Sequence, residues 1–182
     1  YLSHPIKSIA GTNQLAMSDE FAGYHFSKEH GLPDNEVRDI LQTRDGSLWI
    51  LTQQGLARFD GTGFTVFNRA NSPDFLSDEP RALAEDKHGN LWVGGVDLLL
   101  RMSGNSLQRV AFPGNVKFDD AYHLCPDPDG GMWIGGQSTV TRMTDQGVVV
   151  FGPESGLNTG GFVRTLQRDP SGTLFVGTFD GF

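Results

Sequence analysis

The chain is a succession of short apolar segments separated by polar turns that contain glycine. In the first clear set, β-branched and aromatic residues predict strands at Val37–Gln42, Leu48–Thr52, residues 56–59 and Phe64–Phe67. Turns are predicted at residues 44–46, 53–55 and 60–63, because Asp-Gly and Asp-Gly-Thr-Gly are hairpin-turn sequences. No window shows sustained helical periodicity, so the pattern predicts an all-β fold.

This set of strands and turns recurs along the chain. Equivalent turn glycines are 43, 41 and 42 residues apart, and an aromatic residue three positions later keeps the same spacing. The glycines are Gly46, Gly89, Gly130 and Gly172, and the aromatic residues are Trp49, Trp92, Trp133 and Phe175. Four short strands in about 40–45 residues, with an aromatic residue in each unit, are typical of a β-propeller blade. We therefore expect a β-propeller of four-stranded antiparallel blades, in which the repeated aromatic residues pack between blades.

The repeat also sets the expected domain boundaries. Residues 1–20 are a lead-in, and residues 21–182 form a partial propeller with blades at 37–67, 80–110, 121–151 and an incomplete 163–182. This is a partial ring of roughly three and a half blades, whereas propellers usually close with about four to eight. A half-ring leaves unpaired strand edges, which proteins avoid. We expect the chain to belong to a longer protein, or to close the ring by self-association.

Composition and charge narrow the possible partners. The 182 residues include 24 glycines, which the repeated turns explain, and a single cysteine, which permits no disulfide framework or cysteine-based zinc site. The net charge is −8 and no basic run occurs, so we expect no nucleic-acid partner and no membrane contact by this region. The first residues show no signal peptide, and a chain that begins at Tyr1 is expected to be processed or excised.

Three segments of the first unit resemble the two-component regulator propeller repeat. They are residues 31–37 (GLPDNEV), 42–50 (QTRDGSLWI) and 55–61 (GLARFDG), with Leu51 in place of the usual glycine. The resemblance implies an extracytoplasmic sensor module of a bacterial inner-membrane receptor, on its periplasmic or extracellular side. It also implies an output domain of the histidine kinase or diguanylate cyclase type elsewhere in such a receptor, and no catalysis in this region.

One repeat position is a candidate ligand site. Arg38, Arg81, Tyr122 and Arg164 occupy equivalent places just inside the first strand of each unit, so in a ring they would converge near the mouth of the channel. Guanidinium groups and a phenol can bind a carboxylate or sulfate. The alternative is structural: an arginine of the repeat held by loop carbonyls or by a carboxylate of the adjacent blade. Both interpretations stay open at this stage.

Loops on the same face add further candidates. The connections from fourth to first strands are expected at residues 33–36, 77–80, 119–122 and 159–162. The loops between second and third strands are expected at 53–54, 96–97, 137–138 and 179–180. They add Asn35, Gln54, Asp97 and Gln137 to the site, together with His123 on a first strand near the channel.

The remaining polar repeats are expected to be structural. Arg58, Arg101 and Arg142 recur in every complete unit, with Asp86, Asp127 and Asp169 as candidate partners, which favours structural ion pairs. Cys125 is expected to be buried and inert. No histidines share ligand spacing, and residues 127–130 lack the later glutamate of a calcium loop, so we expect no metal site and no cofactor.

Three functions follow, in order of preference. The first is a non-catalytic ligand sensor for an extracellular oligosaccharide or another polar or anionic molecule. The second is a scaffold for protein interactions. The third is a propeller lyase or hydrolase, which would need a histidine or metal at the channel mouth, where His123 is the candidate. The remaining blades of the same protein, or a second copy, are the expected structural partners.

Overall fold

A computed structural model describes residues 14–15, 23–75, 79–113, 116–158, 160–179 and 181. These residues form an all-β structure with two short 3-10 helices, η1 (Lys28–His30) and η2 (Pro153–Ser155). The strands of the first two four-stranded sheets are β3 (Val37–Gln42), β4 (Leu48–Thr52), β5 (Gly55–Phe59), β6 (Phe64–Phe67), β7 (Pro80–Glu85), β8 (Leu91–Gly95), β9 (Leu98–Ser103) and β10 (Ser106–Arg109). The other strands are β1 (Gln14–Leu15), β2 (Gly23–Tyr24), β11 (His123–Pro126), β12 (Met132–Gly135), β13 (Val140–Thr144), β14 (Gly147–Phe151), β15 (Val163–Arg168) and β16 (Leu174–Thr178).

Each sheet is built from consecutive antiparallel strands. The orders are β3-β4-β5-β6, β7-β8-β9-β10 and β11-β12-β13-β14, with two-stranded sheets β15-β16 and β1-β2. The predicted four-stranded antiparallel blades are therefore confirmed, and the third strand of the first blade starts at Gly55 rather than at residue 56. The predicted lead-in, residues 1–20, lies outside the described residues except for β1.

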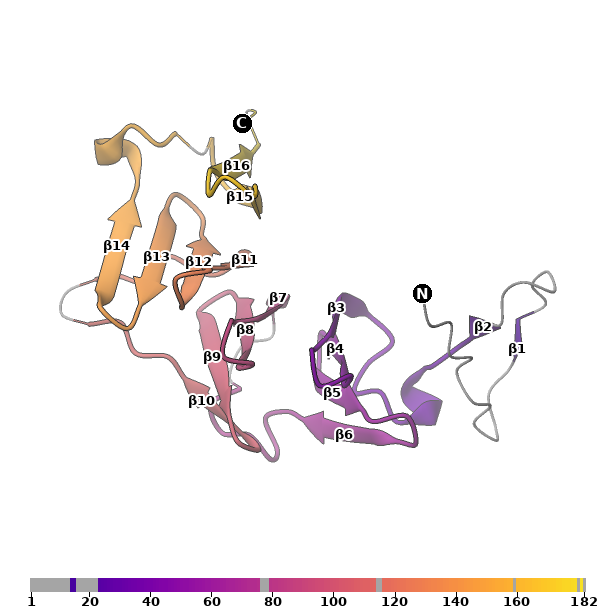
Figure 1. The fold of residues 1–182 in the computed structure, drawn as a ribbon. Coiled ribbons are helices and arrows are strands. Elements are labelled where there is room, and N and C mark those ends of the chain that lie inside the picture. The colour runs from indigo at the N-terminus through magenta and orange to yellow at the C-terminus, as the bar shows by residue number, and fades with distance from the viewer. Residues whose placement is uncertain are drawn as a thin grey trace.

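The sheets follow one another along an arc (Figure 1). The first strands β3, β7, β11 and β15 lie side by side along its inner side, and the fourth strands β6, β10 and β14 lie on its outer side. This is the arrangement of consecutive propeller blades around part of a ring. We call the sheets β3–β6, β7–β10, β11–β14 and β15–β16 blades 1 to 4.

Facing sheets bury the repeated apolar residues. Between blades 1 and 2, a core cluster joins Trp49 and Leu56 of one sheet to Leu83, Val93 and Leu100 of the next. A corresponding cluster joins Trp92 and Leu99 of blade 2 to Leu124, Met132 and Ile134 of blade 3. The aromatic and aliphatic repeats thus pack between blades, because a single sheet cannot bury both of its faces.

Glycine on the second strand controls how closely successive blades approach. A Cβ atom at Gly94 would lie 2.7 Å from the carbonyl oxygen of Ala121, and one at Gly135 would lie 2.5 Å from Cγ1 of Val163. The equivalent residue of blade 1 is Leu51, which is fully buried in the cluster between blades 1 and 2. The side chain of Leu51 therefore fills the interface between blades 1 and 2. At the equivalent glycine of blades 2 and 3, the next blade instead lies too close for a side chain.

The ion pairs of the repeated arginines differ from the expectation. Arg142 pairs with Asp127 at 2.5 Å, but Arg58 pairs with Asp45 of its own turn at 3.8 Å. The carboxylate of Asp86 accepts hydrogen bonds from the Asn90 side chain and the Trp92 indole, and that of Asp169 accepts bonds from Ser171 and Thr173. What the three arginines share is a guanidinium 5.5–5.8 Å from the centre of the tryptophan ring of the same blade.

Candidate functional site

A β-bulge displays the repeated arginine on the first strand of three blades. In blade 1, Val37 pairs with Thr52 and Asp39 pairs with Leu51, so Arg38 is the extra residue. The same register shift leaves Arg81 unpaired between Pro80 and Ala82, and Arg164 unpaired between Val163 and Thr165. A bulge turns a side chain away from the regular alternation of the strand. These side chains lie at the end of the blades where fourth strands connect to first strands, which we call the upper face.

In blades 1, 2 and 3, the side chain at this position contacts a carboxylate that lies two residues earlier in the sequence. Arg38 pairs with Glu36 at 2.9 Å and Arg81 pairs with Glu79 at 2.6 Å. The hydroxyl of Tyr122 donates to Oδ2 of Asp120 at 3.1 Å. The partners are therefore carboxylates of the same blade, whereas the structural alternative named loop carbonyls or a carboxylate of the adjacent blade.

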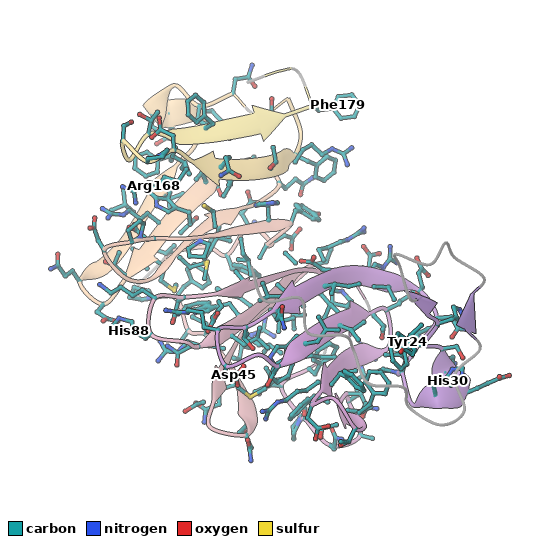
Figure 2. All side chains as sticks on the ribbon, turned by 45° about the vertical axis from the view of Figure 1, so that its right-hand side comes forward. Tyr24, His30, Asp45, His88, Arg168 and Phe179 are labelled. Atoms are coloured by element: carbon teal, nitrogen blue, oxygen red, sulfur yellow. The ribbon has the colours of Figure 1, made fainter. Side chains whose placement is uncertain are left out.

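Arg164 differs from the other members, because Phe162 occupies the place of the acid. Its guanidinium carbon lies 5.9 Å from the ring centre of Phe162 and 5.4 Å from that of Phe179. Phe162 and Phe179 are 37% and 68% exposed. Figure 2 shows Phe179 projecting from the end of β16, at the opposite end of the hairpin from Arg168. No carboxylate among the described residues lies within ion-pair distance of Arg164.

Tyr122 contacts the residue that precedes the first strand of the next blade. The rings of Tyr122 and Phe162 meet edge to face with their centres 5.2 Å apart. Burial raises the pKa of Tyr122, as do its hydrogen bond to Asp120 and the charge of that carboxylate, while the charge of Arg81 lowers it. We call Arg38, Arg81, Tyr122 and Arg164 the upper-face ring. Tyr122 of blade 3 and Arg164 of blade 4 are joined through Phe162, which contacts both.

Two of the predicted site residues, His123 and Asn35, make hydrogen bonds that hold the fold together. Nδ1 of His123 accepts a hydrogen bond from the backbone N–H of Leu166 in the next blade at 3.2 Å. Asp39, at the same position of blade 1, accepts a bond from the N–H of Leu83 at 2.7 Å. Asn35 accepts a bond from the N–H of Lys28 at 2.8 Å, which fixes the loop before β3. Burial lowers the pKa of His123, and the negative charge of Asp39 opposes that shift.

The other three predicted residues, Asp97, Gln137 and Gln54, lie on the loops between second and third strands. Asp97 has a φ of +46°, pairs with Arg109 at 2.7 Å and donates its N–H to Asp120 at 2.9 Å. The N–H of Gln137 donates to the carbonyl of Asp119 at 3.1 Å. Gln54 lines a separate hollow of about 410 Å³. Parts of the predicted loops, residues 77–78, 159 and 180, lie outside the described residues.

The acids and phenylalanines of the upper face lie in the loops predicted for this face but were not chosen as candidate site residues. Glu36, Glu79, Asp120 and Phe162 keep the same 43-, 41- and 42-residue spacing as the ring itself. Aligning the position two residues before each ring member would have found them. Phe179 gives no such signal, because its equivalents are Gln53 or Gln54, Val96 and Gln137, on loops of different shape.

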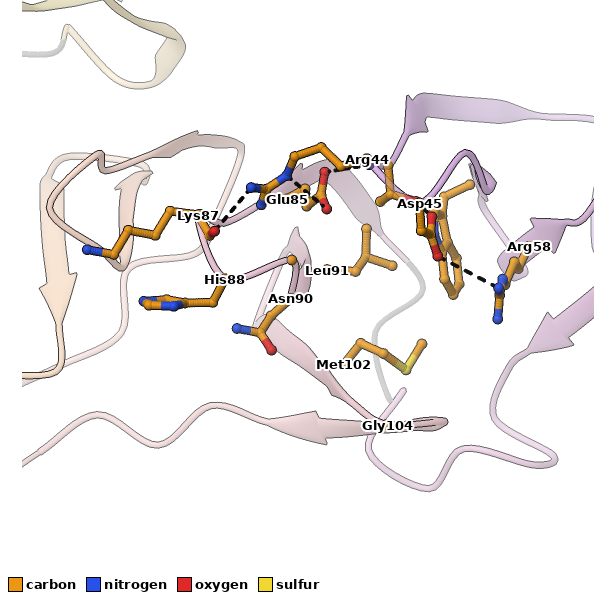
Figure 3. Close-up of a pocket in the computed structure, with 13 residues that line it drawn as sticks. Arg44, Asp45, Arg58, Glu85, Lys87, His88, Asn90, Leu91, Met102 and Gly104 are labelled. Atoms are coloured by element: carbon orange, nitrogen blue, oxygen red, sulfur yellow. Dashed lines mark hydrogen bonds and ion pairs between the residues drawn. The ribbon is translucent and has the colours of Figure 1, made fainter.

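A larger groove of about 500 Å³ opens at the opposite ends of blades 1 and 2, where first and second strands meet in turns (Figure 3). We call this side the lower face. Here Arg44 pairs with Glu85 at 3.3 Å and donates to the carbonyl of Lys87, while Arg58 pairs with Asp45. The contacts of Arg44 tie blade 1 to blade 2, and the Arg58–Asp45 pair lies within blade 1, so these charged groups serve packing. Within the described residues, no three acidic, histidine or cysteine side chains gather as metal ligands.

Comparison with known families identifies the repeat. The model of the family "two component regulator propeller" matches residues 31–54, 74–97 and 115–138. The chain carries two component regulator propeller repeats. These repeats span the approach to the first strand and the first hairpin of blades 1, 2 and 3, so the upper-face residues Arg38, Arg81 and Tyr122 belong to them. No match was found among curated protein sequences.

Solved structures share the arrangement of these propeller repeats. The extracellular domain of BT4673 from B. thetaiotaomicron, described as a one component system, is 20% identical with a TM-score of 0.65, over 85% of this chain and 21% of that one. The extracellular domain of BT3049 from the same organism, described as a hybrid two component system, is 19% identical with a TM-score of 0.55, over 84% and 27%. The chain therefore spans about a fifth to a quarter of these domains, and the likeness shows the fold.

A propeller enzyme is also similar in fold. A catalytically inactive variant of virginiamycin B lyase from Staphylococcus aureus, in complex with Quinupristin, is 15% identical with a TM-score of 0.57, over 81% of this chain and 58% of that one.

Among the described residues of the present chain, no helix has the length and apolar character needed to cross a membrane.

Proposed function

We propose that this chain is part of the ligand-sensing propeller of a bacterial signalling receptor, acting on the extracytoplasmic side of the membrane and without catalysis of its own. The observation that carries the proposal is the upper-face ring, in which Arg38, Arg81 and Arg164 lie on β-bulges, and Arg38, Arg81 and Tyr122 belong to matched two component regulator propeller repeats. The extracellular domains of BT4673 and BT3049, both described as signalling systems, support the same role.

The chemistry of the upper face favours a polar or anionic ligand, with an oligosaccharide as the first class to test. Guanidinium groups, carboxylates and a phenol lie together on this face, and exposed aromatic rings adjoin them. Polar groups supply hydrogen bonds to hydroxyl groups, and aromatic faces pack against the apolar faces of sugar rings. A ligand seated across blades 2 to 4 would change how their first strands pack, which is a physical route from binding to signal.

The contacts of His123 weigh against the lyase alternative. A catalytic base needs a nitrogen free to take a proton from the substrate. Nδ1 of His123 already accepts the N–H of Leu166, and the side chain joins blade 3 to blade 4. A protein-interaction scaffold, the other alternative, predicts that the upper face binds no small polar ligand, so the same binding experiment tests it.

The test is calorimetric titration of the chain with cellotetraose and with tetragalacturonate, a neutral and an acidic oligosaccharide. We expect at least one of them to bind, and Tyr122→Ala to weaken that binding by about tenfold, the effect of removing a charge-assisted or aromatic contact. His88→Ala is the matched control, since His88 is an exposed residue of the lower face. Absence of binding of both oligosaccharides by a folded chain contradicts the oligosaccharide class, and equal loss in both variants contradicts the upper face as the ligand site.

A further inference from the structure

We infer that Arg164, between Phe162 and Phe179, binds the carboxylate of a ligand in which that carboxylate is attached directly to a six-membered ring. The inference rests on the proposed function and names the ligand chemistry of its upper face. The shared chemistry is an anionic group next to a flat apolar ring face. Its two sources are an aromatic acid and a uronic acid sugar.

The first argument is charge. Glu36 and Glu79 already hold Arg38 and Arg81 at 2.9 and 2.6 Å. A ligand anion at those residues would displace a carboxylate that is covalently tethered two positions away, and such a tethered group competes at high effective concentration. Phe162 removes the tethered acid from blade 4. Arg164 is therefore the cation of the ring that an external anion reaches without competition from a described carboxylate.

The second argument is exposure of the aromatic rings. Trp92, a repeated aromatic residue between blades, is 3% exposed, whereas Phe179 is 68% exposed and Phe162 is 37% exposed. Two exposed phenylalanines against one exposed arginine form a small apolar surface around a charge. Such surfaces on a protein commonly mark binding sites.

The third argument is the geometry of the guanidinium. Its carbon lies within 6 Å of both ring centres, at 5.9 and 5.4 Å, in the range of a cation–π contact. A guanidinium that contacts aromatic faces still has N–H donors in its own plane, and two of them match the two oxygens of a carboxylate. A ring attached to that carboxylate then lies close enough to pack on Phe162 or Phe179. A carboxylate without a ring would contact only the guanidinium of Arg164, and a neutral ring would pack only against the phenylalanines.

The test is titration of the chain with four probes, followed by the ¹H–¹⁵N signals of the Arg164 side chain and the Phe179 amide. Benzoate and glucuronate carry both features, acetate carries the anion alone, and glucose carries the ring alone. We expect benzoate or glucuronate to bind at least about tenfold tighter than acetate and glucose. Tighter binding of benzoate would indicate an aromatic acid as the ligand, and tighter binding of glucuronate a uronic acid sugar. Binding of acetate as tight as that of both ring acids overturns the inference.

Variants assign the binding to this site. Phe162→Glu gives Arg164 the tethered acid that Arg38 and Arg81 have, and we expect it to weaken ring-carboxylate binding by about tenfold or more. Arg164→Gln should have the same effect, and Phe179→Ala should weaken benzoate or glucuronate without changing acetate. The matched control is Arg101→Gln, because Arg101 is also exposed and lies 5.7 Å from an aromatic ring, but on the lower face. Equal loss in Arg101→Gln and Arg164→Gln overturns the inference.

The outcomes separate this inference from the proposed function. If an oligosaccharide binds with dependence on Tyr122 but without dependence on Arg164, the sensor proposal stands and the assignment of the anion site is wrong. If the ring acids bind through Arg164 while neither oligosaccharide binds, the site is assigned correctly and the oligosaccharide class is wrong. Circular dichroism of each variant confirms folding, which is expected because Arg164 and Phe179 are exposed.

Discussion

At the scale of single residues, one position of the first strand links blade 1 to blade 2 and blade 3 to blade 4. Asp39 accepts the backbone N–H of Leu83, and His123 accepts that of Leu166. Blade 2 has Ala82 at this place, which cannot accept such a bond, and there Gly94 brings the backbone close to Ala121 instead. The repeat thus fixes the geometry of the position, while the side chain decides whether it adds a hydrogen bond to the backbone contacts between blades.

His123 should make folding stability depend on pH. Burial lowers its pKa from the ordinary value of 6.5, so the unfolded chain takes up a proton more readily than the folded chain does. Its contribution to stability is therefore complete above about pH 6.5 and is lost as the pH falls through the lower pKa of the folded state. Protonation of Nδ1 would also remove the acceptor for the Leu166 N–H.

The measurement is urea unfolding between about pH 7 and pH 5, followed by tryptophan fluorescence. We expect the free energy of unfolding to fall with decreasing pH more steeply for the unmodified chain than for His123→Asn. The asparagine has an oxygen that can accept the same hydrogen bond but does not titrate in this range. Parallel pH profiles for the two proteins would show that His123 does not carry the dependence.

At the scale of the blade, the aspartate at the start of the turn between the first and second strands shows what the sequence can and cannot predict. The strand and turn positions were predictable because Gly46, Gly89, Gly130 and Gly172 all sit at positive φ, between 83° and 104°, where glycine is favoured. The partner of each polar side chain was not. Asp86 binds the indole of Trp92, whereas the equivalent Asp127 binds Arg142 and Arg168, and the buried Nε1 of Trp133 has no partner among the described residues.

The reason is that hydrogen-bond partners depend on neighbouring blades. Arg168 reaches Asp127 from the first strand of blade 4, and the equivalent residues of blades 1 to 3 are Gln42, Glu85 and Pro126, none of which carries that charge. A repeat alignment predicts where a side chain lies but not which of several groups it binds. The candidate site followed the same rule. The ring position and the position two residues before it were predictable from spacing, but the contact of Arg164 with Phe179 depended on packing between elements.

Asp127 should be the most sensitive charged residue at a turn. Burial works against its ionisation, but hydrogen bonds from Arg142 and the Asp129 N–H and the charges of Arg142 and Arg168 together hold the pKa of Asp127 below its ordinary value. Its side chain is fully buried and both arginines are within 3 Å. We expect Asp127→Asn to lower the free energy of unfolding by about 3 kcal/mol, because it leaves two cations without their shared partner.

Asp45→Asn is the matched comparison for Asp127→Asn. Asp45 pairs with Arg58 at 3.8 Å and its side chain is 62% exposed, so solvent screens the pair. Its hydrogen bonds from Ser47 and Thr43 can be retained by an amide oxygen. The expected loss is below about 1 kcal/mol, measured by urea unfolding at neutral pH. Similar losses in the two variants would refute the assignment of Asp127 as a buried link between blades.

At the scale of the whole molecule, the blades form a one-dimensional array in which each contacts its neighbours along the arc. The exposed fraction of the side chain at one repeat position shows whether a neighbouring blade covers that face of each sheet. Leu83, Leu124 and Leu166 are 7%, 5% and 2% exposed, whereas the equivalent Ile40 of blade 1 is 58% exposed. Similarly, Phe175 of blade 4 is 44% exposed, against 3% for the equivalent Trp92. Blades 2 and 3 are therefore covered on both faces, and blades 1 and 4 on one.

This difference predicts a gradient of local stability along the arc, because the stability of a repeat array is close to the sum of each repeat and its interfaces. In this chain, the backbone amides of β8 and β12 should exchange with deuterium most slowly, and those of β4 and β16, their equivalents in blades 1 and 4, more rapidly. Hydrogen exchange followed by mass spectrometry measures this directly. Uniform protection of the four second strands would mean that the array unfolds as one cooperative unit, and that the exposed faces of blades 1 and 4 carry no cost. The expected gradient would instead place β15 and β16, the hairpin that supplies Arg164, among the less protected strands, so that a ligand bound there would be detected as increased protection of blade 4.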